Sequence, residues 1–253
     1  MKRLLPLAGP LARWVLPCLV LLLAPGDALA QALTFDLGAE TAGTTTGRII
    51  QLIALVTVLS LAPSILVMMT SFTRIVVVLS FLRTAMGLQQ TPPNSVVVSL
   101  ALFLTAFVMM PTLETVYDEA LAPLINEDIT EFEAFDRAQV PVRDFMLRHV
   151  RENDLRLFLD ISQAGEVEGP EVTPMRALIP AFMISELRRA FEIGFLLFLP
   201  FLIIDMVVAS ILMSMGMMML PPVMISLPFK LIFFVLVDGW YMVAGSLVQS
   251  YGG

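Results

Sequence analysis

The sequence predicts an all-α, membrane-associated protein. Of its 253 residues, 58% are hydrophobic and only 15% are charged, which is too apolar for an ordinary water-soluble domain. Four long apolar regions are visible, and one substantial polar region carries apolar side chains at helical spacing. The alternating pattern of a half-buried strand is not visible, so helices are expected throughout.

Residues 1–30 are typical of a secretory signal peptide. A short basic start precedes the apolar run from Trp14 to Ala24, and Ala28-Leu29-Ala30 supplies the small-residue cleavage pattern. Cleavage would begin the mature chain at Gln31, outside the cytoplasmic membrane, and make residues 31–48 an exported N-terminal segment. A retained N-terminal anchor is the alternative.

Each of the four apolar regions departs from a plain transmembrane helix; they comprise residues 49–82, 96–110, 193–219 and 224–248. As a continuous helix the first would be about 50 Å long, against a hydrocarbon core of about 30 Å. It must therefore break, tilt or leave the bilayer, and Pro63 is a candidate kink. The second region ends at Pro111 and is shorter than the roughly 20 residues that span comfortably.

Four ionisable residues interrupt these apolar regions: Arg74, Asp205, Lys230 and Asp238. Because a charge in hydrocarbon costs at least about 2.5 kcal/mol, all four are expected to face protein or water. Counting outward from the turn at Pro221, Asp205 and Lys230 differ in depth by about 10 Å at helical rise. This mismatch predicts a poor pair within one subunit. The two side chains would either pair through a staggered neighbour in a ring-like or helical homo-oligomer, or have separate buried partners.

Residues 112–192 form the polar region, with 17 of the 22 acidic residues and eight of the 15 basic ones. The acidic balance argues against binding nucleic acid. Glu186, Arg188, Arg189 and Glu192 form a charged rung with i,i+3 and i,i+4 spacings that runs directly into the apolar residue Ile193. One helix is therefore expected to pass from the polar region into the apolar zone without a separate loop.

The segment from Met213 to Pro222 carries five methionines within seven residues and ends in two prolines, which cannot continue a helix. Flexible thioether side chains can repack against changing partners, so this turn suits a surface that seals and then lets something pass. Taken alone, the segment is equally compatible with padding at the tip of a membrane hairpin.

Residues for catalysis or for a cofactor are not recognisable. His149 is the sole histidine, signal cleavage would remove the sole cysteine, Cys18, and no phosphate-binding glycine motif or nucleophile elbow occurs. We therefore expect neither an enzyme nor a bound metal or cofactor. A small-molecule secondary transporter would also explain Asp205 and Lys230, but such proteins usually show paired internal repeats, and none is visible. An intramembrane hydrolase would lack a facing nucleophile and base.

Long ordered blocks resemble the FliP family of flagellar type III export-gate proteins. They are Met68–Arg83 with Gln89–Asn94, Pro180–Phe195 and Pro221–Trp240, and the likeness extends from about Ile49 to the C-terminus. The acidic stretch 117–139 does not match in detail. The related injectisome export-gate proteins are the nearest alternative.

The resemblance implies a pore complex at the centre of the flagellar basal body, in the bacterial inner membrane with much of the assembly on the periplasmic side. Five copies would wind with FliQ and FliR, contact further export-apparatus and rod components and membrane lipid, and conduct unfolded flagellar subunits. The apparent spans would be bent helical hairpins, residues 49–111 and 193–253, joined by the polar helical region 112–192.

The resemblance also implies roles for individual residues. The methionine gasket of the family falls on Met217, Met218 and Met219. Its pore-lining aromatic residues fall on Phe145 and Phe158, and an inward-facing acidic position falls on Glu186. Ordinary packing between helices, or a surface ion pair, is the alternative for each.

Overall fold

A computed structural model describes residues 50, 52–53, 56–57, 60–61, 64–65, 67–88, 90–162, 173–217 and 219–252 of the chain. The signal peptide, the exported segment 31–48, the predicted kink at Pro63 and the gasket residue Met218 lie outside the described residues. The chain divides into two compact units, Met1–Val56 and Thr57–Gly253. All that follows concerns the second unit.

Regular structure in the described part of the second unit is helical, as the sequence predicted. The helices are α4 (Phe72–Ala85), α5 (Asn94–Val116), the π-helix η2 (Tyr117–Leu121), α6 (Ala122–Ile125), α7 (Glu131–His149), α8 (Glu152–Ile161), α9 (Met175–Ser214), α10 (Pro222–Leu236) and α11 (Gly239–Gln249). The continuous α9 confirms the prediction that one helix passes from the polar region into the apolar zone.

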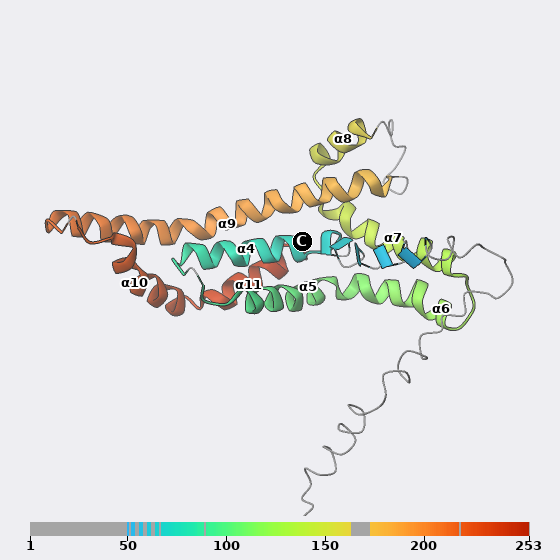
Figure 1. Cartoon of the computed structure of the whole chain (residues 1–253), viewed down its shortest axis with the longest axis horizontal. Helices are drawn as coiled ribbons and strands as arrows, with labels where there is room; N and C mark the ends of the chain where they lie inside the picture. Colours follow the sequence, from blue (N-terminus) through green and yellow to red (C-terminus); the bar gives the residue numbers. More distant parts are fainter. Residues whose placement is uncertain are drawn as a thin grey trace, which may run out of the picture. The chain divides into compact units, whose positions relative to one another are not determined.

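Helix α4 is the centre of the main hydrophobic core (Figure 1). Three of its apolar side chains, Ile75, Val78 and Leu82, are completely buried. They belong to one cluster with residues of α5, α9, α10 and α11, such as Ala101 and Leu247. A helix enclosed in this way must pair any polar side chain that it carries inside the protein.

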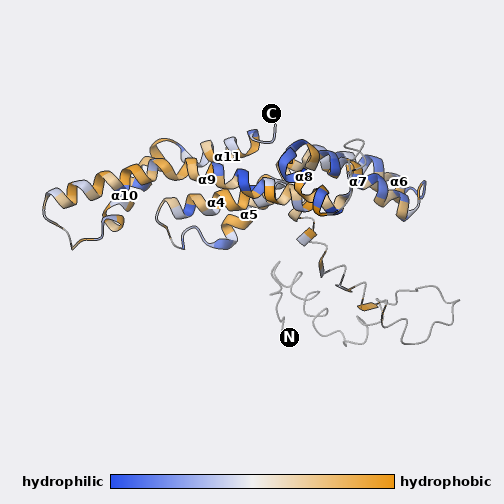
Figure 2. Cartoon of the chain, turned by 90° about the horizontal axis from the view of Figure 1, so that it is seen from above, coloured by the Kyte–Doolittle hydropathy of each residue, from blue (hydrophilic) through white to orange (hydrophobic). Residues whose placement is uncertain are grey.

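Two helical stretches are long and apolar enough to cross a membrane, Asn94–Ile125 and Met175–Ser214. The pair α10 and α11 passes the same test together, although the two helices are bent by 63° at their junction. In Figure 2 hydrophobic residues predominate on α4, α5, α9, α10 and α11, whereas hydrophilic residues gather on α6, α7 and α8. The protein is thus an all-α membrane protein with an attached polar helical region.

The structure extends one helix beyond a proline and shows a break in the first apolar region. Helix α5 does not end at Pro111 but continues to Val116 and is followed directly by η2, where the hydrogen-bond pattern widens. The expected break in the first apolar region is present at residues 69–71, where the chain turns before α4 begins.

The polar region packs through a second core that joins α7 to the first part of α9. Phe145 and Met146 of α7 pack with Leu178 and Phe182 of α9, and Met109 of α5 completes the cluster. Helix α7 begins after Thr130, whose side chain accepts a hydrogen bond from the backbone N–H of Glu133. The polar helices are therefore held on the same long helix that enters the apolar core.

Close contact between α4 and α9 depends on Gly194. A Cβ atom added there would lie 2.7 Å from Cδ2 and 3.2 Å from Cβ of Phe81, so the side chain could not simply rotate away. We predict that Gly194→Ala lowers the free energy of unfolding by about 1–3 kcal/mol.

Thermal unfolding of the detergent-solubilised chain measures this effect. Gly245→Ala is the matched control, because an added Cβ there meets no heavy atom within 4 Å. That substitution should stabilise α11 by about 0.5–1 kcal/mol. Equal effects of the two substitutions would contradict the packing described here.

Candidate functional site

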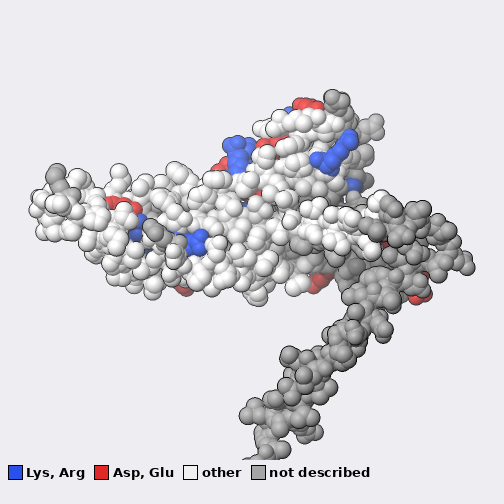
Figure 3. Space-filling model, in the orientation of Figure 1, with Lys and Arg blue, Asp and Glu red and all other residues white. Residues whose placement is uncertain are grey.

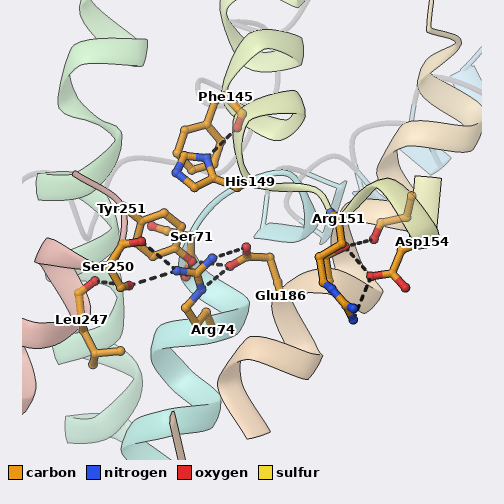
Figure 4. Close-up of polar contacts among 12 residues, drawn as sticks. Ser71, Arg74, Phe145, His149, Arg151, Asp154, Glu186, Leu247, Ser250 and Tyr251 are labelled. Atoms are coloured by element: carbon orange, nitrogen blue, oxygen red, sulfur yellow. Dashed lines mark hydrogen bonds and ion pairs between the residues drawn. The ribbon is translucent and has the colours of Figure 1, made fainter. Parts of the chain in front are cut away.

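A buried ion pair joins α4 to α9 (Figure 4). Arg74 Nε lies 2.8 Å from Glu186 Oε2, and Arg74 Nη2 lies 2.5 Å from Glu186 Oε1. The two side chains are 1% and 0% exposed, respectively. Two parallel N–H···O bonds fix the guanidinium and carboxylate in one plane, which gives the pair a defined geometry as well as energy.

The last residues of the chain complete this pair. Arg74 Nη1 donates to Ser250 Oγ at 2.9 Å and to the Ser250 carbonyl oxygen at 3.3 Å. The Tyr251 hydroxyl donates to Glu186 Oε2, and the Tyr251 ring lies against the guanidinium, 3.8 Å from the ring centroid to Cζ. We call Ser250 and Tyr251 the C-terminal clasp. Burial, and secondarily the nearby Glu186 carboxylate, raises the pKa of Tyr251.

Aromatic rings from α7 and α9 cover the clasp. The Tyr251 ring stacks on Phe145 with centroids 6.0 Å apart and lies 5.0 Å from the His149 ring. His149 Nδ1 donates to the Phe145 carbonyl oxygen at 2.7 Å, and Phe182 packs edge-on against Phe145. The sole histidine is therefore a packed side chain. Phe145, expected to line a pore, is buried within its own chain.

Glu186 is buried, whereas the sequence placed it in a charged group with Arg188, Arg189 and Glu192. Two other members of that group do form an exposed ion pair, in which Arg188 Nε lies 3.0 Å from Glu192 Oε1. Glu186 is on the opposite side of α9 and faces Arg74, a partner 112 positions away in the sequence. Helical spacing correctly predicted the exposed pair but contains no information about a partner on another helix.

A second polar cluster lies where α9, α10 and the end of α4 meet. Lys230 Nζ is 2.6 Å from Asp205 Oδ2, and Ser226 Oγ donates to Asp205 Oδ1 at 2.5 Å. Lys230 Nζ also donates to the carbonyl oxygen of Ala85 at 3.2 Å, the last residue of α4. A cation at the C-terminus of a helix is favoured by the helix dipole. Lys230 therefore ties the α9–α10 hairpin to α4.

The expectation that Asp205 and Lys230 match poorly within one subunit is wrong. The count from Pro221 treated residues 215–221 as part of the helix that carries Asp205, and it therefore overestimated the depth of Asp205. Helix α9 ends at Ser214 and α10 begins at Pro222, so the two charged residues lie nine and eight residues from their helix ends. Their depths therefore agree, and the pair forms inside one chain.

Asp238 differs from the other three ionisable residues of the apolar zone. Its side chain is exposed in the isolated chain, so the expectation of a buried charge is not met there. The residue has a φ of 51° and precedes α11 at the bend between α10 and α11. Asp is among the few residues that adopt this left-handed conformation readily. Its evident role is in the bend.

The methionine loop, residues 215–221, is fixed at both ends. The N–H of Met217 donates to the carbonyl oxygen of Leu212 at 3.0 Å. The N–H of Gly216 donates to the carbonyl oxygen of Met213 at 3.1 Å. With Gly216 at a φ of 76°, this is a Schellman motif that closes α9. Pro222 then starts α10 at a position where its missing N–H is not needed.

The described gasket methionines are directed away from the chain's own core. Met219 is 97% exposed and Met217 is 40% exposed. Phe158, on α8, is half-buried. The structure thus brings Arg74, Glu186 and Phe145 together but leaves the methionines apart from them.

Sequence reasoning missed the contribution of Tyr251, Ser250 and Ser226. All three are small or amphipathic side chains near helix ends, and no spacing rule distinguishes them from ordinary residues. Among the described residues, no group of three or more His, Cys, Asp or Glu side chains could hold a metal ion.

The Tyr251 hydroxyl gives a testable contribution to stability. Tyr251→Phe keeps the ring against Arg74 but removes one bond to the buried carboxylate, and should lower the free energy of unfolding by about 1–2 kcal/mol. Because the folded-state pKa lies above the unfolded value of about 10, this contribution persists below pH 10 and falls at higher pH.

Unfolding in detergent at pH 7 and pH 11 measures both effects. The Tyr251→Phe variant should lack the part of the high-pH loss that the parent shows. Tyr241→Phe, at a side chain that is 77% exposed, is the control and should change stability by less than about 0.5 kcal/mol. Equal effects at the two tyrosines would refute the clasp.

Comparison with known proteins identifies the family. Residues 55–247 match the FliP family. A flagellar biosynthetic protein FliP of Caulobacter vibrioides is 59% identical over 238 residues, which cover 94% of this chain and 89% of the relative. Proteins of the same name from Bacillus subtilis and Aquifex aeolicus are each 55% identical to this chain. The matched residues make up 80% of this chain in both cases, and 91% and 85% of the two relatives, respectively. The chain therefore belongs to the FliP family.

Proposed function

We propose that this chain is a pore-forming subunit of the flagellar type III export gate, which conducts unfolded flagellar subunits across the cytoplasmic membrane. Family membership supports a place in the membrane-located flagellar export apparatus. The single observation that carries the pore assignment is the methionine loop. It presents a fully exposed Met219 at the tip of a hairpin whose base is fixed by buried polar contacts. The relatives named above are flagellar proteins, which favours a flagellar gate over an injectisome gate.

A ring of methionine loops would form a seal without a chemical reaction. An apolar constriction excludes ions because water leaves it, as in hydrophobic gates of channels. A passing polypeptide would displace the thioether side chains, whose three rotatable bonds let them close around varied residues. The gate is not proposed to be an enzyme, and the energy for export comes from elsewhere in the apparatus.

The proposal requires several copies of the chain, five by analogy with the family, together with FliQ and FliR. The charged residues do not support this requirement, because Arg74, Asp205 and Lys230 all find partners within one chain. Exposed apolar side chains support it instead. On the α9–α10 hairpin Met206, Met219 and Val235 are 64%, 97% and 75% exposed, and lipid or neighbouring copies must cover them.

The remaining sequence expectations form part of the same proposal. Residues 1–30 act as a cleaved signal, and the polar region 112–192 stands on the periplasmic side within the basal body, near rod components. The hairpins comprise residues 49–111 and 193–253. Phe158 is half-buried and accessible to a pore. Phe145 and Glu186 are covered by their own chain, so a pore-lining role for them would require the surrounding helices to separate on assembly.

Replacing Met217, Met218 and Met219 together by alanine tests the seal. The substitution removes the long side chains but leaves the Schellman motif and the Pro222 helix start unchanged, so the complex should still assemble. Conductance of the purified complex in a planar bilayer should rise from the background level to a resolvable leak of small ions.

Two controls accompany this measurement. The triple Met→Leu variant keeps much of the side-chain volume and should leak less than the alanine variant. Met242→Ala changes a similarly exposed methionine on α11 and should leave conductance at the parent level. An intact triple-alanine complex that is as ion-tight as the parent would show that these methionines only pad the hairpin.

A further inference from the structure

A cavity of about 310 Å³ lies between α5 and α7, beside the C-terminal clasp. Its lining includes Pro111 of α5, Pro141 and Phe145 of α7, and Tyr251 of the clasp. The volume is roughly ten times the share of one water molecule in the liquid, and it lies at the lower end of the range for small-molecule pockets. The cavity therefore has room for a small ring compound or for one aromatic side chain.

Two buried polar side chains line this cavity and have unused hydrogen-bonding capacity. Thr112, on α5, is 8% exposed, and His149, on α7, is 9% exposed. The nearby Thr105 and Thr115 each donate to a backbone carbonyl oxygen of α5, whereas the Thr112 hydroxyl has no hydrogen-bond partner among the described residues. Because buried polar groups are normally paired, an unpaired hydroxyl beside a cavity indicates a missing partner.

The hydrogen bond that His149 makes to its own helix determines the role of its second ring nitrogen. Nδ1 donates to the Phe145 carbonyl oxygen at 2.7 Å, so in the neutral ring Nε2 carries no proton and is an acceptor. Within the described part of the chain nothing donates to Nε2. Figure 4 shows this nitrogen directed away from the Phe145 carbonyl, on the side of α5. The cavity thus offers a ligand one buried acceptor and one buried hydroxyl.

We propose that this cavity binds a neutral phenol group, supplied either by a small phenol or by a tyrosine side chain. A phenolic hydroxyl can donate to His149 Nε2 and accept from the Thr112 hydroxyl, so one ligand atom pairs both unused groups. The ligand ring would lie among flat side chains, of which Phe145 and Tyr251 favour aromatic contact. An alkyl alcohol would lack that contact, and a plain hydrocarbon would leave both polar groups unpaired.

Charged side chains at the opening of the cavity also favour a neutral ligand. Asp144 and Arg148 line the cavity and are exposed, and their opposite charges offset each other. They belong to the polar region, where Figure 3 shows further charged side chains gathered over α8 and the adjoining part of α9. A ligand can therefore enter from water. The inference does not depend on the export-gate proposal, because every group that it uses lies within one chain.

The sole histidine of the chain makes the site directly observable. We expect the full chain, labelled with nitrogen-15 histidine in mild detergent and carrying no added histidine tag, to show a protonated Nδ1 and an unprotonated Nε2. The probe is p-cresol, the side-chain analogue of tyrosine, which should shift the Nε2 signal in a saturable manner. Toluene, which has the same ring and methyl group but no hydroxyl, should bind about tenfold more weakly or worse.

Substitutions of threonine on α5 test the hydroxyl contact. Thr112→Val keeps the shape of the side chain and should weaken p-cresol binding about tenfold without changing toluene binding. Thr112→Ser keeps the hydroxyl and should retain p-cresol binding. Thr105→Val is the matched control, because Thr105 is also 8% exposed but donates to the Ala101 carbonyl of its own helix. It should leave the affinity unchanged.

N-acetyltyrosinamide distinguishes the two sources of the phenol group. Binding as tight as that of p-cresol assigns the cavity to a tyrosine side chain of a polypeptide, whereas binding of p-cresol alone assigns it to a free phenol. An Nε2 signal that moves only in proportion to the p-cresol concentration overturns the proposal, because it shows uptake into detergent. Equal affinity for toluene, or equal effects of Thr112→Val and Thr105→Val, would overturn it as well.

Discussion

The buried pair of Arg74 and Glu186 is the interaction on which the remaining structure depends. Both side chains are enclosed by apolar helices, where an unpaired charge would cost several kcal/mol. Their pairing therefore fixes the register of α4 against α9, and it is complete only when Ser250 and Tyr251 contribute their hydrogen bonds. The chain thus joins its first fully described helix, its longest helix and its C-terminus at one point.

A second constraint of the same kind acts at the other end of α4. Lys230 connects Asp205 of α9, its own helix α10 and the final carbonyl of α4. Between these two polar clusters α4 is held at both ends against α9. The methionine loop lies beyond the second cluster and is closed by a Schellman motif and a proline, so it is a flexible set of side chains on a fixed base. The proposed seal requires this combination, because its side chains would have to close again after each passing polypeptide.

The helical class, the apolar regions and the single helix that continues from the polar region into the apolar zone could be predicted from the sequence. These features depend on local composition and periodicity. The sequence also indicated that Arg74, Asp205 and Lys230 need protein partners. It could not identify those partners, since Glu186 is 112 positions from Arg74 and pairing depends on the relative register of two helices. The depth argument for Asp205 failed because the helix ends, set by a loop capping motif, were not known.

The central claim is that Arg74 and Glu186 stabilise the fold as a coupled pair. A double-mutant cycle with Arg74→Met and Glu186→Leu, read as free energies of unfolding in detergent, tests it most directly. Each single substitution leaves the other charge buried without its partner and should lower the free energy of unfolding by about 3–5 kcal/mol. The double substitution should lower it by clearly less than the sum of the two. Strictly additive costs, or single substitutions without effect, would contradict the account.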